Sequence, residues 1–460
     1  MSRHQLSGVS TPTSPQRASR TTPPATAAAW YAVAVLTVAN VSGFIDRQIL
    51  SLLVRPMQRD LQISDTQISL LMGLGFVVFY SVLGVPLGRW VDRGHRPRIV
   101  ALGVTLWSLM TAATGAAASY AQLFLARIGI GVGEATLSPA AVSIIADRFP
   151  RDRLGTAMST YMMGTFLGSG LAYVLGAYVV GQFAEPGTFT LPWGATIFRW
   201  QAVFWFLGLP GLLIALLALT MGEPRAGSAR SATASASTGE FAAYLRTHAR
   251  TLAAVSLGFA CSAAVNYGVG AWLATFLIRA HGWTEASAGT LQGVLTAVLG
   301  PVGVLGGGWL SDRWTRRGHV DAPLRVGIAG ALGMLVFAGL YPVVPSAAVA
   351  AALLVPVNIF AALPWGAANA AIAEAMPERL RGQGSAVYWL VVNLLSGAVG
   401  PTAVALLTDH VFGGEAGVRW SLVTTTVVGM GTAMALLASG RGAYVRTVQA
   451  ARAEDLARVS

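Results

Sequence analysis

The sequence predicts an all-α membrane protein, with twelve transmembrane helices in two pseudo-symmetric bundles of six. Only 11% of the 460 residues are charged and 54% are hydrophobic, whereas about a quarter of the residues in a soluble domain are charged. Apolar runs of about 20 residues recur along the chain, as a hydrocarbon core of ~30 Å requires. A polar segment near the middle and repeated loop motifs then divide the chain into two similar halves.

The expected elements follow from these runs and from the segments between them. Residues 222–246 contain the run GSARSATASAST and are expected to be a cytoplasmic linker between bundles at 28–221 and 247–440. Residues 1–27 are rich in Ser, Thr and Pro and lack the apolar core of a signal peptide, so we expect a disordered tail. Residues 441–460 are expected to be a second cytoplasmic tail. The expected helices are 30–53, 66–88, 97–118, 121–146, 154–181, 198–221, 249–279, 285–310, 324–344, 347–374, 381–408 and 417–438.

The distribution of arginine predicts the orientation. With the N-terminus inside, 24 arginines fall in the tails, the linker and the cytoplasmic loops, and five fall in the opposite loops. Positive charge is enriched on the cytoplasmic side of membrane proteins, so we expect both termini there, in a multi-pass protein of the inner (plasma) membrane. The arginines collect at the ends of apolar runs, which argues against a nucleic-acid partner despite the net charge of +12.

The composition and the motifs argue against several classes of function. The single cysteine, Cys261, excludes an internal disulfide and argues against a thiolate metal site, so we expect no metal and no cofactor. The glycines of ARIGIGVGEA lack the preceding strand of a dinucleotide site and are expected to pack helices. All six histidines lie in tails, loops or helix ends, which argues against an enzyme with a catalytic His in the membrane.

An internal repeat relates the two halves. The loop GRWVDRGHRPR after the second expected helix and the loop GWLSDRWTRRG after the eighth both contain G-x-x-x-D-R, 220 residues apart. FPRDRLG (149–155) and MPERLRG (376–382) are offset by 227 residues. Such repeats are typical of secondary transporters that hold substrate between the halves near the midplane.

The repeated motif also predicts a cytoplasmic gate. Gly88, Asp92 and Arg93 in the first copy match Gly308, Asp312 and Arg313 in the second. We expect Gly88 to allow close helix approach and the Asp and Arg residues to form an ion-pair latch when the inner side closes. The alternative is that these are ordinary topology charges.

These features resemble the major facilitator superfamily over residues 28–440. FIDRQIL, ARIGIGVGEA and DRFPRDRLGTAMS resemble the spinster branch more specifically, whose members move lysolipids and related amphiphiles. The resemblance implies alternating-access transport. Two features depart from the family pattern: the fifth expected helix lacks the proline of the usual antiporter signature, and Pro97 interrupts the basic end of the first signature loop.

Four charges lie within expected spans, where such residues are rare and face a cavity or each other. They are Asp46 and Arg47 on the first helix and Arg127 and Glu134 on the fourth. Adjacent residues project about 100° apart on a helix, so Asp46 and Arg47 need other partners. The helical rise places Asp46 and Arg127 roughly 6–8 Å below the outer boundary, which predicts an Asp46–Arg127 ion pair.

Glu134 lies about 10 Å deeper than Arg127, close to the midplane. We expect no basic residue at its depth, so that desolvation favours its neutral form and suits it to carry a proton. Movement of Arg127 towards Glu134 would then release the proton, while Arg47 would point towards the cavity or its outer gate. The alternative is a purely structural network of all four charges.

Polar and aromatic residues predict an asymmetric substrate cavity with an apolar wall and hydrogen-bonding groups, which suits an amphiphile. Each residue taken alone is also consistent with helix packing. The candidates are Asn266, Tyr267, Asn369, Trp365, Tyr388, Asn393, Thr165, Ser169 and Phe259, with Trp272, Trp389 and Tyr173 as further lining residues.

The expected function is proton-coupled transport of a lysolipid-like amphiphile by a monomer, with protons and membrane lipids as its other partners. A transporter of a small organic anion, such as a sugar acid or aromatic acid, is the alternative; it would need cavity arginines without carboxylate partners. A receptor without transport activity on the same fold stays open as well.

Overall fold

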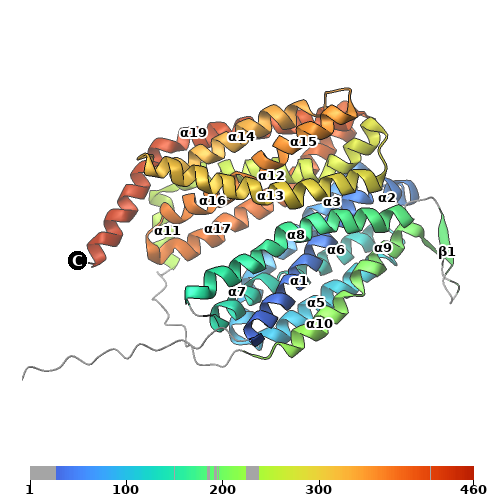
Figure 1. Cartoon of the computed structure of the whole chain (residues 1–460), viewed down its shortest axis with the longest axis horizontal. Coiled ribbons are helices and arrows are strands. Elements are labelled where there is room, and N and C mark those ends of the chain that lie inside the picture. The colour runs from blue at the N-terminus through green and yellow to red at the C-terminus, as the bar shows by residue number, and fades with distance from the viewer. Residues whose placement is uncertain are drawn as a thin grey trace, which may run out of the picture.

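A computed structural model describes residues 27–149, 151–183, 187–190, 194, 196–223, 238–414 and 416–459. It consists of two helical bundles that lie side by side, one from each half of the chain (Figure 1). The expected N-terminal tail, apart from Ala27, and most of the expected linker lie outside the described residues.

The N-terminal bundle contains ten helices and a short antiparallel hairpin among the described residues. They are α1 (Ala27–Leu52), α2 (Val54–Leu61), α3 (Asp65–Met72), α4 (Leu74–Arg93), α5 (Arg96–Thr114), α6 (Tyr120–Glu134), α7 (Leu137–Arg148), α8 (Arg151–Phe183), β1 (Thr188–Thr190), β2 (Thr196–Phe198), α9 (Arg199–Gly208) and α10 (Gly211–Thr220).

The second half of the described chain begins with α11, a short helix that lies mostly in the expected linker, and continues with the C-terminal bundle. Its elements are α11 (Thr238–Thr247), α12 (Ala249–His281), α13 (Glu285–Arg316), α14 (Ala322–Leu340), α15 (Ala347–Ala362), α16 (Pro364–Glu374), η1 (Glu378–Leu380), α17 (Arg381–Leu394), η2 (Leu395–Val399), α18 (Gly400–Leu407), η3 (Thr408–Phe412) and α19 (Gly417–Val459).

Helix occupies each of the twelve ranges in which the sequence predicts one. Within the described part of the chain, eleven helical segments are long and apolar enough to cross a membrane. The expected helix at 97–118 forms α5 but is not one of the eleven, because its first turn carries Arg96 and Arg98. The crossing of the membrane by all twelve segments, and the orientation of the termini, stay predictions.

Several long segments are broken near their middle, and the breaks position residues between the bundles. The helix is interrupted at Gly73, between α3 and α4, and again just after Glu134, between α6 and α7. A side chain at Gly73 would overlap the backbone carbonyl of Gly397, which lies in the π-helical turn η2 of the other bundle. Non-helical backbone at membrane depth is tolerated where it is buried in protein.

At one end the two bundles are joined by an outer latch, which consists of Gln58, Asp65 and Arg279. The guanidinium of Arg279 donates to both carboxylate oxygens of Asp65, at 2.6 and 2.7 Å. Gln58 accepts from Arg279 at 2.8 Å and donates to Asp65 at 2.6 Å. Beside the latch, Thr66 donates both its backbone N–H and its hydroxyl to Asp409. The predicted orientation places this end outside the cell.

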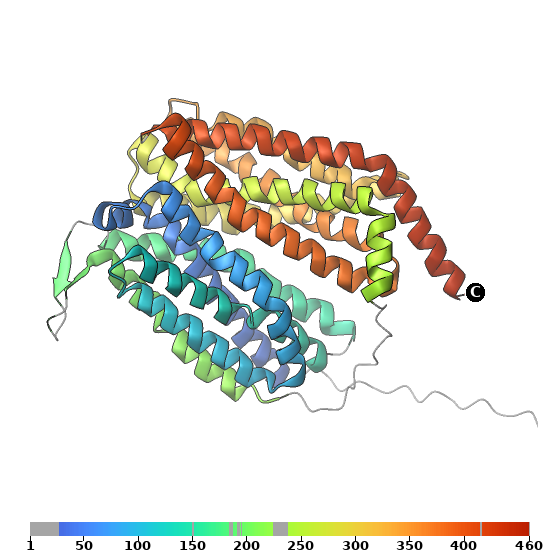
Figure 2. The ribbon, with the colours of Figure 1, turned by 180° about the vertical axis from the view of Figure 1, so that it is seen from behind.

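The opposite end has no such connection among the described residues. Its ion pairs stay within one bundle, as Arg96 does with Asp147 and Glu223, and Arg441 with Asp321. Figures 1 and 2 show the bundles in contact at the α2–α3 end and apart at the end that carries the C-terminus. With the predicted orientation, the joined end faces outwards and the other end faces the cytoplasm.

The residues of the predicted cytoplasmic gate lie at this open end. Asp312 and Arg313 are exposed, and the Arg313 guanidinium lies 5.3 Å from the centroid of the Trp309 ring. The side chains of Asp92 and Arg93 lie outside what the structure describes, so the latch between the two motif copies stays a prediction. Gly88 has only Pro139 near the position of a Cβ, at 3.9 Å.

The expected tail at 441–460 continues α19 as helix to Val459. Ion pairs hold it against the rest of the C-terminal bundle: Arg441 contacts Asp321 at 2.5 Å, and Asp455 contacts Arg381 at 3.5 Å. These partners are far apart in sequence, so the apolar pattern that ends near residue 438 did not reveal the extension.

Asp65→Asn should weaken the outer latch, because removing one partner of a buried ion pair leaves the other charge uncompensated. Ser69 is fully buried beside Thr402, so a Ser69→Cys reporter in a Cys261→Ser background is shielded while the outer end is closed. We expect external, membrane-impermeant maleimide to label this reporter several-fold faster when Asp65→Asn is added. Glu285→Gln is the matched control and should leave labelling unchanged. Equal labelling with and without Asp65→Asn would show that the latch does not hold this end closed.

Candidate functional site

The centre of the candidate site is an ion pair between α1 and α6. Arg47 Nε donates to Glu134 Oε2 at 2.7 Å, and Arg47 Nη2 contacts the same oxygen. The side chain of Glu134 is 2% exposed and that of Arg47 is 21% exposed. Gly43, one turn before Arg47, makes room for the carboxylate, because a Cβ there would lie 3.2 Å from Glu134 Oε2.

An aromatic cage surrounds the guanidinium of Arg47. Its central carbon lies 5.0, 4.7 and 4.9 Å from the ring centroids of Phe44, Phe76 and Tyr80, which come from α1 and α4. Arginine is attracted to aromatic faces at such distances. Tyr267, on α12 of the other bundle, lies within electrostatic reach of Arg47. The ion pair is therefore formed within the N-terminal bundle, and a residue of the C-terminal bundle lies within electrostatic reach of it.

Asp46 and Arg127 do not form the predicted ion pair in this conformation. Arg127 Nη1 instead donates to the backbone carbonyl of Asp46 at 3.0 Å. Both carboxylate oxygens of Asp46 are buried without a hydrogen-bond partner, as are Nε and Nη2 of Arg127. The expectation that no basic residue reaches Glu134 was also wrong, since Arg47 does. Helical rise gives the depth of a Cα atom, but it ignores the direction and length of an arginine side chain.

This cluster of two acids and two arginines retains unused hydrogen-bonding capacity. Glu134 Oε1, like the Asp46 carboxylate, has no partner in the described structure. Buried polar groups are paired in the great majority of cases, and those at functional sites are the usual exceptions. A proton on either carboxylate, or a movement of Arg127, would change the pairing within the cluster without any large change of fold.

The predicted substrate residues divide by exposure. Tyr267, Trp365 and Asn369 are exposed, and Thr165 and Asn393 are partly buried. They come from α8, α12, α16 and α17, and contacts between α4 and α17 and between α8 and α13 join the two bundles.

Two asparagines predicted to contact substrate, Asn266 and Asn369, donate hydrogen bonds to backbone carbonyl groups. Asn266 donates to Ala361 O at 3.1 Å and leaves its own carbonyl oxygen unpaired. Asn369 donates to the carbonyl of Trp365, one turn earlier on the same helix, at 3.1 Å. Each amide therefore keeps acceptor capacity that a substrate can use.

Other predicted lining residues are packed inside a bundle. Phe259 is 3% exposed and lies in the core of the C-terminal bundle, where its ring packs against Gly327. Trp272 is fully buried and donates its indole N–H to Pro401 O at 2.9 Å. Ser169 and Tyr388 are 8% and 4% exposed. A helix pattern in a membrane protein does not separate a cavity-facing apolar residue from a core one, so Phe259 and Trp272 were misplaced.

An aromatic group joins the bundles near these residues. Phe166 on α8 lies edge-on to Trp365 on α16, with ring centroids 6.2 Å apart, and Trp365 lies 6.4 Å from Trp389 on α17. Sequence reasoning missed Phe166 and the cage residues Phe44, Phe76 and Tyr80. The spacing of Phe44 three residues before Arg47, and of Phe76 and Tyr80 four residues apart, places aromatic rings on single helix faces and was the available signal.

Comparisons with known proteins agree with this architecture. The model of the Major Facilitator Superfamily matches residues 36–401. An MFS-type efflux pump of Mycolicibacterium smegmatis is 30% identical over 390 residues, which cover 83% of this chain and 85% of that protein. The probable L-galactonate transporter of Escherichia coli K12 is 26% identical over 371 residues, with coverages of 75% and 76%. Protein spinster homolog 1 of Xenopus tropicalis is 27% identical over 409 residues, with coverages of 84% and 74%.

Among solved structures, a bacterial homolog of the human lysosomal transporter spinster, in an inward-facing and unoccupied conformation, matches with a TM-score of 0.77 at 25% identity. The match covers 93% of this chain and 98% of that one. The resemblance to the superfamily and its spinster branch is thereby confirmed.

The Arg47–Glu134 pair should show strong coupling in a double-mutant cycle. Arg47→Ala or Glu134→Ala alone should lower the free energy of unfolding by about 3–5 kcal/mol, because each leaves a buried charge without its partner. The double variant should lose clearly less than the sum of the two. Thermal unfolding of purified protein in detergent measures this, with Arg316→Ala, an exposed site, as control. Additive losses would contradict a direct interaction.

Proposed function

This chain belongs to the Major Facilitator Superfamily, and we propose that it is a proton-coupled secondary transporter of a lysolipid-like amphiphile, working by alternating access as a monomer in the inner (plasma) membrane. The motifs that resemble the spinster branch suggest this substrate class, and the spinster relatives and the matching spinster-like structure support the branch. Transport by rocking of two repeats around a central site is the general behaviour of such folds.

The observation that carries the proposal is the Arg47–Glu134 pair, caged by aromatic rings where α1 faces the other bundle. Protonation of Glu134 would cancel the charge that holds Arg47. The guanidinium would then be available to an anionic headgroup, which it binds well because it offers several donors in one plane.

The coupling has a defined sign. An anionic group that pairs with Arg47 leaves the Glu134 carboxylate without its counter-charge, which favours proton uptake there. A proton on Glu134 in turn favours the anionic group at Arg47, because coupling between two binding events is reciprocal. Proton and anionic substrate would therefore bind together rather than exclude each other.

An apolar tail would find a surface beside this site. Phe166, Trp365 and Trp389 form an aromatic group across the two bundles, and Asn266 and Asn369 have unused acceptors nearby in the C-terminal bundle. Ligand sites with apolar walls and a few polar groups are the common pattern for such substrates.

Transport of a small organic anion is the second candidate, supported by the E. coli relative named as a probable L-galactonate transporter. Such a substrate would use Arg47 in the same way. It would have no use for the aromatic group at Trp365, which distinguishes the two candidates.

Proteoliposome uptake of a fluorescent lysophosphatidic acid tests the proposal, with and without an inwardly directed proton gradient. We expect gradient-stimulated uptake by the wild type. Glu134→Gln should lose the stimulation by roughly tenfold or more, because it cannot exchange a proton at this position. Glu285→Gln removes one carboxylate outside the site and should behave as the wild type.

Uptake of labelled L-galactonate is measured in parallel. Stimulated galactonate uptake without lysolipid uptake would replace the first candidate by the second. Full gradient stimulation in Glu134→Gln would exclude Glu134 as the proton carrier, whichever substrate is moved.

A second prediction concerns the aromatic group. Trp365→Ala should weaken lysolipid uptake several-fold, through a higher KM, because the tail loses apolar contact area. It should leave galactonate uptake unaffected if that compound is transported at all. Equal effects on both substrates would point to a general role of Trp365 in bundle packing.

A further inference from the structure

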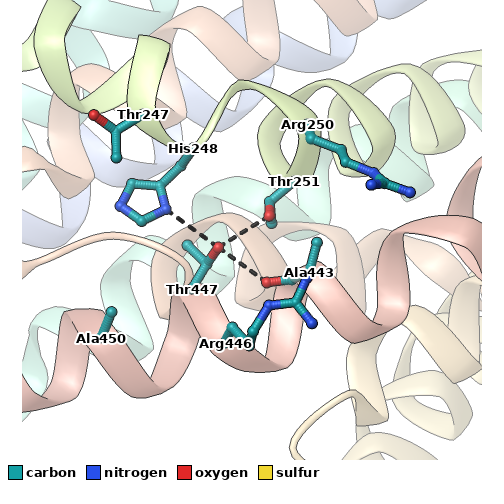
Figure 3. A pocket seen from close by; sticks show the side chains of 8 residues that line it. All are labelled: Thr247, His248, Arg250, Thr251, Ala443, Arg446, Thr447 and Ala450. Atoms are coloured by element: carbon teal, nitrogen blue, oxygen red, sulfur yellow. Dashed lines mark hydrogen bonds between the residues drawn. The ribbon is translucent and has the colours of Figure 1, made fainter.

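A cavity of about 340 Å³ lies outside the candidate site, between the N-terminal end of α12 and residues 443–450 of α19. Figure 3 shows the side chains that line it. They are Thr247, His248, Arg250, Thr251, Ala443, Arg446, Thr447 and Ala450. None of these residues takes part in the transport mechanism proposed above.

Thr447 is the hub of the cavity's polar floor. It donates to Ala443 O at 3.0 Å, and its oxygen lies 2.9 Å from the Thr251 hydroxyl and 3.3 Å from His248 Nδ1. A hydroxyl has a single proton, so when Thr447 donates it to Ala443, both Thr251 and His248 must donate to Thr447. Thr251 and Thr447 are 3% and 4% exposed, so this floor is buried.

Two exposed arginines flank this floor, and the described residues include no acidic partner for either. Arg250 precedes Thr251 on α12 and Arg446 precedes Thr447 on α19, and in Figure 3 their guanidinium groups lie to the right of the hub, that of Arg250 above it and that of Arg446 below it. In the described part of the chain, neither forms an ion pair or a hydrogen bond. Most neighbouring arginines do, as Arg441 does with Asp321.

The surrounding charges leave the cavity positive. Glu454 is an acidic residue within electrostatic reach of His248, but it is bound to Arg379 at 2.5 Å. The positive end of the α12 dipole also lies here, since His248 is the residue that precedes the helix.

The depth of the cavity matches that of lipid headgroups. Thr251 and Arg279 of the outer latch are 28 residues apart on α12, which corresponds to roughly 42 Å of helix. A bilayer with its headgroups is about 40–45 Å thick. With the latch at the outer surface, Thr251 lies at the level of the inner headgroups.

We propose that this cavity binds a phosphate group, held by Arg250 and Arg446, and that its source is the headgroup of an anionic phospholipid of the inner leaflet. Arginine forks match phosphate oxygens, and basic pockets between membrane helices on the cytoplasmic side suit anionic lipid headgroups. Because α12 also carries Tyr267, beside Arg47, a lipid bound here would be linked to the transport site through one helix.

Native mass spectrometry of the full chain in detergent tests this, with added phosphatidylglycerol or phosphatidylcholine. We expect the wild type to retain phosphatidylglycerol in preference to phosphatidylcholine. Arg250→Gln/Arg446→Gln should lower that retention by roughly tenfold or more. Arg316→Gln/Arg317→Gln removes the same charge from exposed positions at the C-terminal end of α13 and should not lower it.

Inorganic phosphate in a thermal-shift assay identifies the source of the phosphate group. Stabilisation of the wild type by phosphate, without selective retention of phosphatidylglycerol, would keep the site and overturn the lipid source. Equal retention of phosphatidylglycerol in both double variants, or no response to either compound, would overturn the proposal. If the first double variant folds poorly, Arg446→Gln alone serves the same comparison.

Discussion

The buried ion pair between Arg47 and Glu134 is the constraint around which the N-terminal bundle is organised. A carboxylate that is 2% exposed at membrane depth needs a counter-charge, and the counter-charge must reach it from another helix. Gly43 provides the space for this approach, and Phe44, Phe76 and Tyr80 enclose the guanidinium from α1 and α4. Three helices are therefore positioned by one electrostatic requirement. The ion pair also lies within electrostatic reach of Tyr267 in the opposite bundle.

The charged contacts between the bundles and the ion pairs within each bundle lie at opposite ends of the molecule. Between the bundles, charged contacts occur at the end of Asp65 and Arg279, while at the other end the ion pairs of the described residues tie each bundle to itself, as Arg96 does with Asp147 and Glu223. Such internal pairing would stiffen each bundle in the alternating-access mechanism proposed above. An alternating-access mechanism requires that division between stiff bodies and a changeable interface.

Much of the fold was predictable, because it depends on local patterns. The apolar runs located all twelve helical ranges, and the linker and the repeated G-x-x-x-D-R loops indicated two halves. The four membrane-depth charges were also found from sequence alone, since any charge within an apolar run is conspicuous. Their pairing was not, because it depends on which way Asp46 and Arg47 point around α1 and on how far an arginine side chain extends. The burial of Phe259 and the cage around Arg47 likewise depend on contacts between helices, which a single helical pattern does not contain.

The close approach of Gly73 and Gly397 has a consequence for how the outer end can open. At this point the backbone carbonyl of Gly397 lies directly against Gly73, and the short, branched side chain of Val77 packs against Gly397, so little can rotate to relieve a partial separation. A seal of this kind cannot loosen by degrees, since packed interfaces have discrete arrangements rather than a continuum. The outer end should therefore be either shut or parted as a whole. Half-open forms, through which ions could leak while the inner end is also open, would then be scarcely populated, and the membrane's ion gradients would be preserved between transport cycles.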